Sequence, residues 1–271
     1  MNFEVKNTEL LNISKKYSAV FVGPVRNCGP FLKDVLDNIE RVGSLFKSYT
    51  CVFVESDSTD NSLELLKEYA EGKNNINVIS LGNIAPQIPS RTQRIAAARN
   101  VGIEFCEKNG LLDNHDFYIQ MCVDNVNADK IDLDGVLSCF QYPINDWECM
   151  TANQKSNYYD IWTLRCKDWI DYDCWWEVDY NRPQFMTREQ AINLHVSSRA
   201  IYLPKELGLI EVDSAHGGLS IYKSYIARGC RYFGVHPSRK AEESDIMSFC
   251  RGVRAKGGRI FINCEMINLQ N

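Results

Sequence analysis

The sequence lacks any apolar run long enough to cross a lipid bilayer, although it contains 271 residues. A membrane-spanning helix needs about 20 consecutive, mostly apolar residues. The start of the chain, residues 1–16, mixes charged and apolar side chains and lacks the basic beginning and long apolar centre of a secretory signal. We therefore expect neither a transmembrane segment nor a signal peptide.

A surplus of positive charge is also missing. The chain has 30 lysine and arginine residues against 35 aspartate and glutamate residues, which gives a net charge of −5. A protein that binds nucleic acid without sequence specificity needs a broad positive surface, so we expect no nucleic-acid partner. The hydrophobic fraction of 45% is typical of a globular protein with a full core, and the length favours one large α/β domain over two small ones.

The eleven cysteines lack the paired C-x-x-C spacings of a zinc site. Many of them lie within apolar strand or helix patterns, where a thiol behaves as a small hydrophobic side chain. We therefore expect reduced, mostly buried thiols and a cytoplasmic protein, in which the glycosylation sequon at Asn12 stays unused.

Short apolar runs alternate with helical patterns in the first third of the chain. Residues 18–23 form an apolar run, and apolar residues then recur at helical spacing over residues 31–42. Further apolar runs follow at residues 51–54 and 76–81, again separated by a polar loop and a helical pattern. Strands that alternate with helices in this way predict βαβ units and a mostly parallel sheet.

The most informative stretch, residues 116–127, is an apolar run that breaks abruptly into small polar side chains. It predicts a buried strand that delivers Asp124 to a cleft, because ligands of open α/β sheets bind beyond the carboxyl ends of the strands. Asn125 and Asn127 add neutral oxygen ligands, and Mg²⁺ and Mn²⁺ prefer oxygen ligands. The same residues are common in a simple Asx turn, so the stretch alone leaves both interpretations open.

Basic residues cluster in a predicted helix that begins near residue 91. Arg91, Arg94 and Arg99 form the densest basic cluster ahead of the Asp124 strand. A guanidinium group suits phosphate oxygens, so this helix is a candidate for binding a diphosphate. A solvated helix face would show the same pattern.

Four motifs follow one another in an informative order. They are Pro24-Val25-Arg26-Asn27 after the first strand, Glu55-Ser56-Asp57-Ser58-Thr59-Asp60 after the second, Ala98-Arg99-Asn100, and Asp124 after the fourth strand. This order resembles that of GT-A glycosyltransferases, and most closely the capsule-associated, cryptococcal-mannosyltransferase-like group with its relatives in bacteria and large DNA viruses. The resemblance implies a single α/β GT-A domain with a mostly parallel central sheet flanked by helices. Residues 1–130 would bind the nucleotide sugar and residues 131–271 the acceptor.

The resemblance also implies where the donor binds. In this family the ends of the first two strands hold the nucleotide of a UDP- or GDP-sugar. The residues thereby assigned to the nucleotide-sugar site are Pro24, Val25, Arg26, Asn27, Glu55 and Asp57. An Asp-x-Asp motif holds a divalent cation, Mn²⁺ or Mg²⁺, on the diphosphate. Cys122 stands in place of the first Asp, so Asp124 remains as the implied metal ligand, with Asn125 beside it.

The second half carries further resemblances around the sugar. Residues 158–165 resemble the family's Tyr-Asp-x-Trp-x-x-Arg stretch, which implies that Asp160 and Trp162 border the sugar. From the residues alone this segment predicts a strand, and an ion pair between Asp160 and Arg165 is an alternative. Trp175 lies among acidic residues, a mixture that suits carbohydrate rings and hydroxyls but also a loop packed over a cleft.

Paired glycines form another such segment. His216-Gly217-Gly218 opens a stretch that resembles the family's Gly-Gly-Leu-x-Ile-Tyr-Lys motif, in which the glycines let the backbone approach the donor sugar. We therefore place these three residues at the sugar and acceptor site. A plain turn between two strands would need the same glycines.

Acidic residues precede the last predicted helix. In the family an acidic motif at this place supplies the base that deprotonates the acceptor, which makes Asp245 and Glu243 the catalytic candidates. Spacing back from Gly257 favours Asp245, with Glu243 as the competitor. Acids in a first helical turn are also favoured by the helix dipole without any catalytic role.

The resemblance thus implies transfer of a hexosyl or pentosyl group from a nucleotide diphosphate sugar to a glycan hydroxyl, with inversion and with the help of a metal. Two alternatives stay open. A sugar-nucleotide nucleotidyltransferase would need a glycine-rich, lysine-bearing phosphate loop after the first strand, which residues 23–29 lack. A catalytically inactive carbohydrate-binding relative would explain the loss of the first Asp at Cys122.

Overall fold

The computed structural model describes residues 5–270, and all the elements named below lie in that range. The strands are β1 (Ser18–Val25), β2 (Ser48–Glu55), β3 (Ile76–Ser80), β4 (Phe117–Met121), β5 (Cys149–Gln154), β6 (Leu209–Val212), β7 (Leu219–Lys223) and β8 (Ile260–Leu269). The α-helices are α1 (Thr8–Ser14), α2 (Gly29–Gly43), α3 (Ser62–Ala70), α4 (Arg91–Lys108), α5 (Leu111–Asn114), α6 (Leu133–Leu137), α7 (Cys174–Asp179), α8 (Arg188–His195), α9 (Ser224–Ala227) and α10 (Asp245–Ala255). Short 3-10 helices are η1 (Asn125–Asn127), η2 (Ser138–Gln141), η3 (Ile144–Asp146), η4 (Ser197–Arg199) and η5 (Lys205–Leu207).

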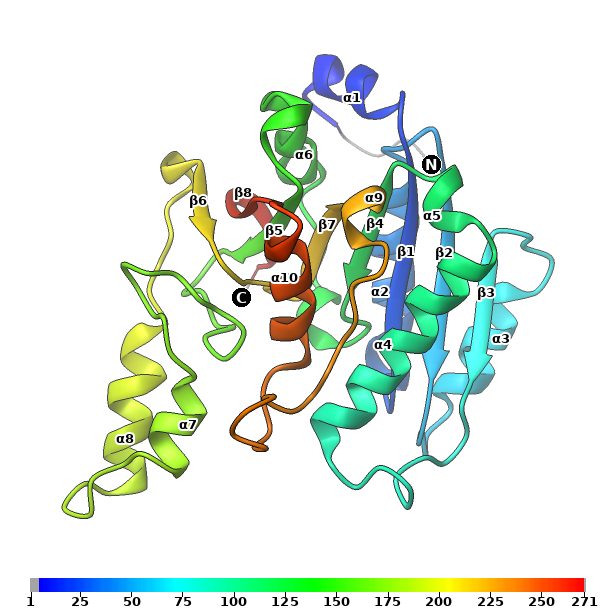
Figure 1. Ribbon diagram of the computed structural model, residues 1–271. Coiled ribbons are helices and arrows are strands. Elements are labelled where there is room, and N and C mark those ends of the chain that lie inside the picture. Colours follow the sequence, from blue (N-terminus) through cyan, green and yellow to red (C-terminus); the bar gives the residue numbers. More distant parts are fainter. Residues whose placement is uncertain (1–4, 271) are drawn as a thin grey trace.

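The described strands form one eight-stranded sheet with the order β3-β2-β1-β4-β7-β5-β8-β6 (Figure 1). The first four strands in this order are parallel neighbours, and β5 and β8 form a further parallel pair. β7 runs antiparallel between β4 and β5, and β6 runs antiparallel to β8 at the edge. The predicted α/β class with a mostly parallel sheet is confirmed.

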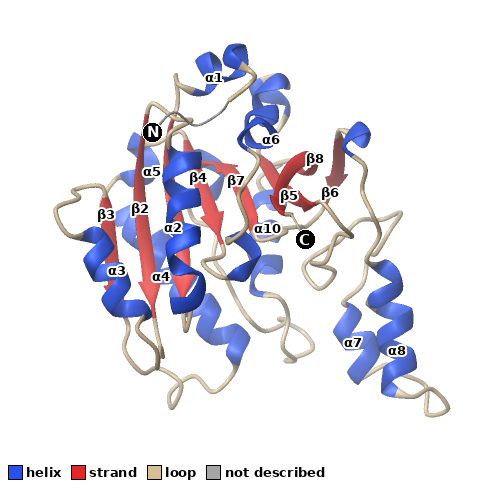
Figure 2. Cartoon of the chain, turned by 180° about the vertical axis from the view of Figure 1, so that it is seen from behind, coloured by secondary structure: helices blue, strands red, loops and turns tan. Residues whose placement is uncertain are grey.

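Side chains of the central strands alternate between two apolar cores, one on each face of the sheet. On β1, Ala19 and Phe21 belong to the core that contains α2 and α3, whereas Val20 and Val22 belong to the core beneath α4 and α10. The alternation follows from the two-residue period of a strand, and burial of both faces explains the continuous apolar run in the sequence. α4 covers the sheet in Figure 1, and α2 and α3 cover it when it is seen from behind in Figure 2.

The local predictions are confirmed in the first half of the chain and fail at one segment of the second half. The apolar runs at 18–23, 51–54 and 76–81 lie in β1, β2 and β3, and the basic cluster opens α4. The strand predicted at residues 158–165 is wrong, because this segment consists of loop and turn apart from an isolated bridge at Arg165. Its buried apolar residues Tyr158, Ile161 and Leu164 recur every third residue, which does not fit the two-residue period of a strand.

Two further features bear on the expectations from composition. Within residues 5–270, no helix is both long enough and apolar enough to cross a membrane. All eleven cysteines are free thiols, and only Cys122 and Cys166 are not fully buried.

α7 and α8 pack against each other and project away from the sheet as a separate pair (Figure 1).

Candidate active site

A cavity of about 400 Å³ opens at the carboxyl ends of β1 and β4. These strands are neighbours, but the chain first runs outward from β1 through β2 and β3 and only then returns to β4. Such a reversal of strand order leaves a crevice in which α/β proteins bind their ligands. The lining contains twelve of the predicted site residues: Pro24, Val25, Arg26, Asn27, Arg91, Arg94, Arg99, Asp124, Asp160, Trp162, His216 and Asp245.

The loop after β1 forms one wall of this cavity and is held in place by the loop after β2. Asn27 has a positive φ of 51°, and its side-chain oxygen accepts a hydrogen bond of 2.7 Å from the backbone N–H of Thr59. The Nε of Arg26 donates to the carbonyl of Asp57 at 3.4 Å. These contacts fix the backbone of the wall, while the Arg26 side chain stays exposed.

Glu55 and Asp57 do not line the cavity but organise the loops around it. The Glu55 carboxylate, buried at the end of β2, accepts from the backbone N–H of Ser58 and from the hydroxyl of Ser80. One oxygen of Asp57 accepts from the backbone N–H groups of Ile84 and Ala85 at 2.9 and 2.8 Å. Both carboxylates therefore hold the loops that surround the cavity.

The three arginines of α4 line the cavity but differ in their surroundings. Arg91 is exposed, and its side chain makes no hydrogen bond or ion pair with any of residues 5–270. The Nη1 of Arg94 donates to the carbonyls of Ile88 and Pro89 at 2.9 and 2.6 Å, which holds the loop before α4. Arg99 is buried. Arg91 is thus the one of the three whose guanidinium is unpaired in the described chain.

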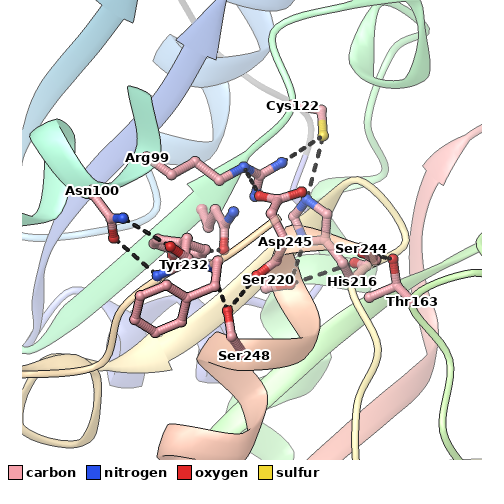
Figure 3. Close-up of polar contacts among 12 residues, drawn as sticks. Arg99, Asn100, Cys122, Thr163, His216, Ser220, Tyr232, Ser244, Asp245 and Ser248 are labelled. Atoms are coloured by element: carbon pink, nitrogen blue, oxygen red, sulfur yellow. Dashed lines mark hydrogen bonds and ion pairs between the residues drawn. The ribbon is translucent and has the colours of Figure 1, made fainter. Parts of the chain in front are cut away.

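Arg99 forms an ion pair with Asp245, the first residue of α10 (Figure 3). The distance from Nε to Oδ2 is 2.9 Å, and both side chains are more than nine-tenths buried. Burial raises the pKa of Asp245, and the positive charge of Arg99 counteracts this rise. A carboxylate in this position is shielded from water and held in a fixed orientation.

Cys122 and His216 form a second contact at the floor of the cavity (Figure 3). The Sγ of Cys122 lies 3.3 Å from Nε2 of His216, and Nδ1 of His216 lies 2.6 Å from the hydroxyl of Ser220. Burial, assisted by the charge of Arg99, lowers the pKa of His216 well below its ordinary value, so the imidazole is neutral. Burial and the charge of Asp124 raise the pKa of Cys122, which remains a thiol.

Asp124 follows β4 and caps η1, with Oδ1 accepting a 3.2 Å hydrogen bond from the backbone N–H of Val126. Burial raises its pKa, while Arg99 and Arg91 lower it. Within residues 5–270, no three His, Cys, Asp or Glu side chains are grouped closely enough to hold a metal by themselves. The remaining oxygen of Asp124 fits a Mg²⁺ or Mn²⁺ ion that takes its other ligands from phosphate and water, as such ions commonly do.

Asp160 and Trp162 line the cavity from the segment that follows β5. The two oxygens of Asp160 accept from the hydroxyl of Thr163 at 2.8 Å and from the backbone N–H of Gly217 at 3.1 Å. The alternative ion pair between Asp160 and Arg165 is wrong, because Arg165 contacts Asp173 at 3.6 Å. The indole N–H of Trp162 is buried and has no partner in the described chain, so a ligand oxygen would satisfy it.

Gly217 and Gly218 form a turn behind Asp160 rather than part of the lining. Both have positive φ, at 62° and 87°, and a Cβ on Gly217 would collide with the carbonyl oxygen of Ala152. Three other predicted residues also lie outside the lining: Asn125, Trp175 and Glu243. The ring of Trp175 is covered by Arg188 at 5.6 Å, within the projecting pair of α7 and α8.

Several lining residues were not among the predicted ones. Tyr159 and Thr163 lie in the segment singled out for Asp160, and Ser244 precedes Asp245. The hydroxyls of Thr163 and Ser244 are 2.9 Å apart, which joins the two segments (Figure 3). Because these residues are close in sequence to the predicted Asp160 and Asp245, the sequence contained a signal that could have identified them. Thr92, the residue after Arg91, is there because its hydroxyl donates to the carbonyl of Gly234 at 2.7 Å, a contact between distant segments that the sequence does not reveal.

A parallel sheet whose switch point opens into a cavity with arginines and carboxylates is typical of enzymes that bind nucleotides. The chain belongs to glycosyl transferase family 2, whose model matches residues 21–192. No curated protein matches the sequence.

Solved structures share the fold at low sequence identity. GalNAc-T7 with UDP, GalNAc and Mn²⁺ is 11% identical with a TM-score of 0.51, and the match covers 94% of this chain and 44% of that one. S. aureus TarS in complex with UDP-GlcNAc is 12% identical with a TM-score of 0.50, and the match covers 94% of this chain and 59% of that one. Mannosyltransferase PcManGT from Pyrobaculum calidifontis with GDP-Man and Mn²⁺ is 13% identical with a TM-score of 0.48, covering 93% and 56%. The chain thus spans less than two thirds of the length of each.

Proposed function

We propose that this protein transfers a hexosyl or pentosyl group from a UDP- or GDP-sugar to a hydroxyl of a glycan, with inversion at the anomeric carbon. The observation that carries the proposal is the composition of one cavity. It brings the free guanidinium of Arg91, the carboxylate of Asp124 and the buried carboxylate of Asp245 together from three distant segments. Membership of family 2 supports the reaction class.

The donor would lie with its nucleotide against the loop after β1. Arg26 and Arg91 are the exposed cations of the lining, so they would meet the diphosphate oxygens. Asp124 would hold a divalent cation, and such an ion supplies positive charge that stabilises the departing diphosphate. GalNAc-T7 with UDP and Mn²⁺ and TarS with UDP-GlcNAc are relatives in fold whose ligands agree with this assignment.

Asp245 would act as the general base toward the acceptor hydroxyl. Burial raises its pKa, which strengthens it as a base, and Arg99 keeps it ionised so that it can take up the proton. Glu243 is less suited to this role because it pairs with Arg251 outside this cavity. The unsatisfied indole N–H of Trp162 and the Asp160 segment would border the transferred sugar.

Two narrower assignments belong to the same proposal. The order of motifs supports a place in the capsule-associated, cryptococcal-mannosyltransferase-like group, and hence an acceptor that is itself a glycan. The free thiols support a reducing, cytoplasmic compartment.

The test is turnover of a panel of UDP- and GDP-sugars in the presence of Mn²⁺, with release of the nucleoside diphosphate as the readout. We expect slow hydrolysis of one donor by the wild-type protein and none by Asp124→Ala. If no donor is hydrolysed and calorimetry detects no nucleotide binding, the protein is an inactive relative. Release of pyrophosphate from a nucleoside triphosphate and a sugar 1-phosphate would instead identify a nucleotidyltransferase.

A further inference from the structure

A second pocket, of about 460 Å³, lies beside the donor cavity and has no part in the reaction described above. We call it the arginine–acid pocket. Its lining consists of Arg165, Asp171, Tyr172, Asp173, Asp213, His236, Arg239, Glu243, Met247, Arg251 and Arg254. These residues come from the loop after β5, the loop before α7, the end of β6, the loop before α10, and α10 itself.

The segment that leads into α10 separates the two pockets. Glu243 lines the arginine–acid pocket, whereas Ser244 and Asp245 line the donor cavity. Neighbouring residues of an extended segment point to opposite sides, and the helix that begins at Asp245 turns this side chain back to the cavity. The segment after β5 also contributes to both, with Thr163 lining the donor cavity and Arg165 lining the arginine–acid pocket.

Glu243 is the first indication that the pocket takes a ligand. The residue is only 1% exposed, and one carboxylate oxygen pairs with Arg251. The other oxygen, Oε2, is buried and has no hydrogen-bond partner in the described part of the chain. A buried carboxylate oxygen without a donor is costly, so a ligand that brings a hydroxyl group would stabilise it.

The pocket also offers free donors and a second acceptor. The Nδ1 of His236 accepts from the backbone N–H groups of Ser238 and Arg239 at 3.2 and 3.1 Å, which leaves the Nε2–H of a neutral ring free to donate. Asp171 is exposed and can accept. The guanidinium of Arg239 lies over the ring of Trp176 at 4.7 Å, at the base of the projecting α7.

The charges of the pocket are balanced, because four arginines face four acids. Three of these arginines are paired within it, with contacts of 3.6 Å between Arg165 and Asp173 and 3.2 Å between Arg254 and Asp213, in addition to the pair of Arg251 and Glu243. A site for an anionic group would carry a surplus of arginine. Donors and acceptors in balanced number, without net charge, instead match the hydroxyls of an uncharged sugar ring.

We propose that the arginine–acid pocket binds a neutral saccharide unit of the acceptor, next to the unit that reacts in the donor cavity. The role as an acceptor site rests on the proposed function, whereas saccharide binding itself does not. Glu243 then holds the acceptor, and Asp245, two residues further on, faces the reacting hydroxyl.

The experiment is saturation-transfer NMR on the full-length protein with methyl glycosides of glucose, galactose, mannose and xylose and with methyl glucuronide, each with and without saturating UDP and Mn²⁺. We expect at least one neutral glycoside to bind, and UDP to leave it bound. Glu243→Gln and Asp171→Asn should each weaken this binding about tenfold or more, since each removes a charged acceptor. Asp171 is exposed, so its variant tests the pocket even if Glu243→Gln unfolds the protein.

The matched control is Glu107→Gln. Glu107 forms a comparable ion pair with Arg231, with 2.6 Å between the two side chains, and neither residue lines the pocket. This variant should leave glycoside binding unchanged. The proposal is overturned if no neutral glycoside binds, if only the glucuronide binds, if UDP displaces the glycoside, or if both pocket variants bind like the wild type. Failure of UDP to bind, with glycoside binding intact, would contradict the proposed donor site and leave this pocket standing.

Discussion

The buried pair of Arg99 and Asp245 allows the sharpest prediction. Arg99→Met keeps most of the side-chain volume but leaves the Asp245 carboxylate without its partner at 2.9 Å. Both side chains are more than nine-tenths buried, so water replaces the lost contact only poorly. Removing one partner of a buried ion pair costs about 3–5 kcal/mol, because the other charge stays buried and uncompensated. This is a large part of the roughly 5–15 kcal/mol by which a folded domain is stable.

The loss should depend on pH in a defined direction. Burial raises the pKa of Asp245 and Arg99 lowers it, so removing Arg99 raises this pKa further. A carboxyl whose pKa is raised on folding binds its proton more tightly in the folded state. Its stabilising contribution is therefore complete below the unfolded pKa and is lost as the pH rises through the folded pKa. The variant should be closest to the wild type in acid and weakest at neutral pH.

Urea unfolding at several pH values measures this free energy directly. The double variant Arg99→Met with Asp245→Asn removes both charges and should recover most of the stability lost at neutral pH. Arg188→Met is the matched control, because it breaks an exposed pair with Asp179 at 2.7 Å and should change stability little. A loss that is independent of pH, or a double variant no more stable than Arg99→Met, would refute the reasoning.

Three further predictions concern activity. Asp245→Asn should lower kcat by ~10²–10⁴-fold with little change in the affinity for UDP. Glu243→Gln should instead raise mainly the KM for the acceptor. The reverse pattern would make Glu243 the base. Asp124→Ala should abolish Mn²⁺-dependent nucleotide binding in calorimetry, and Cys122→Asp should tighten it; full activity of the first variant in EDTA would exclude a metal at Asp124. Arg91→Gln should weaken UDP binding about tenfold. It should not change the stability in urea, since the Arg91 guanidinium has no hydrogen-bond or ion-pair partner in the described chain. Unchanged affinity for UDP would remove Arg91 from the diphosphate site.

The sequence by itself determined the parallel first half of the sheet, the loop after β1 that lines the cavity, and the position of Asp124. Apolar runs of strand length and helical spacing are local patterns, so β1, β2, β3 and α4 follow from short windows of the chain. Asp124 was predictable for the same reason, since a residue directly after a buried strand of a parallel sheet lies at its carboxyl edge.

Only the tertiary structure decided how the polar residues are paired. Arg91, Arg94 and Arg99 are equivalent in the sequence, yet one is free, one holds a loop and one is buried against Asp245. Glu243 and Asp245 were separated only because α10 begins between them and turns their side chains into different pockets. Such pairing depends on which distant segments meet in space and on the direction in which each side chain leaves its helix or strand. Local sequence patterns contain neither kind of information.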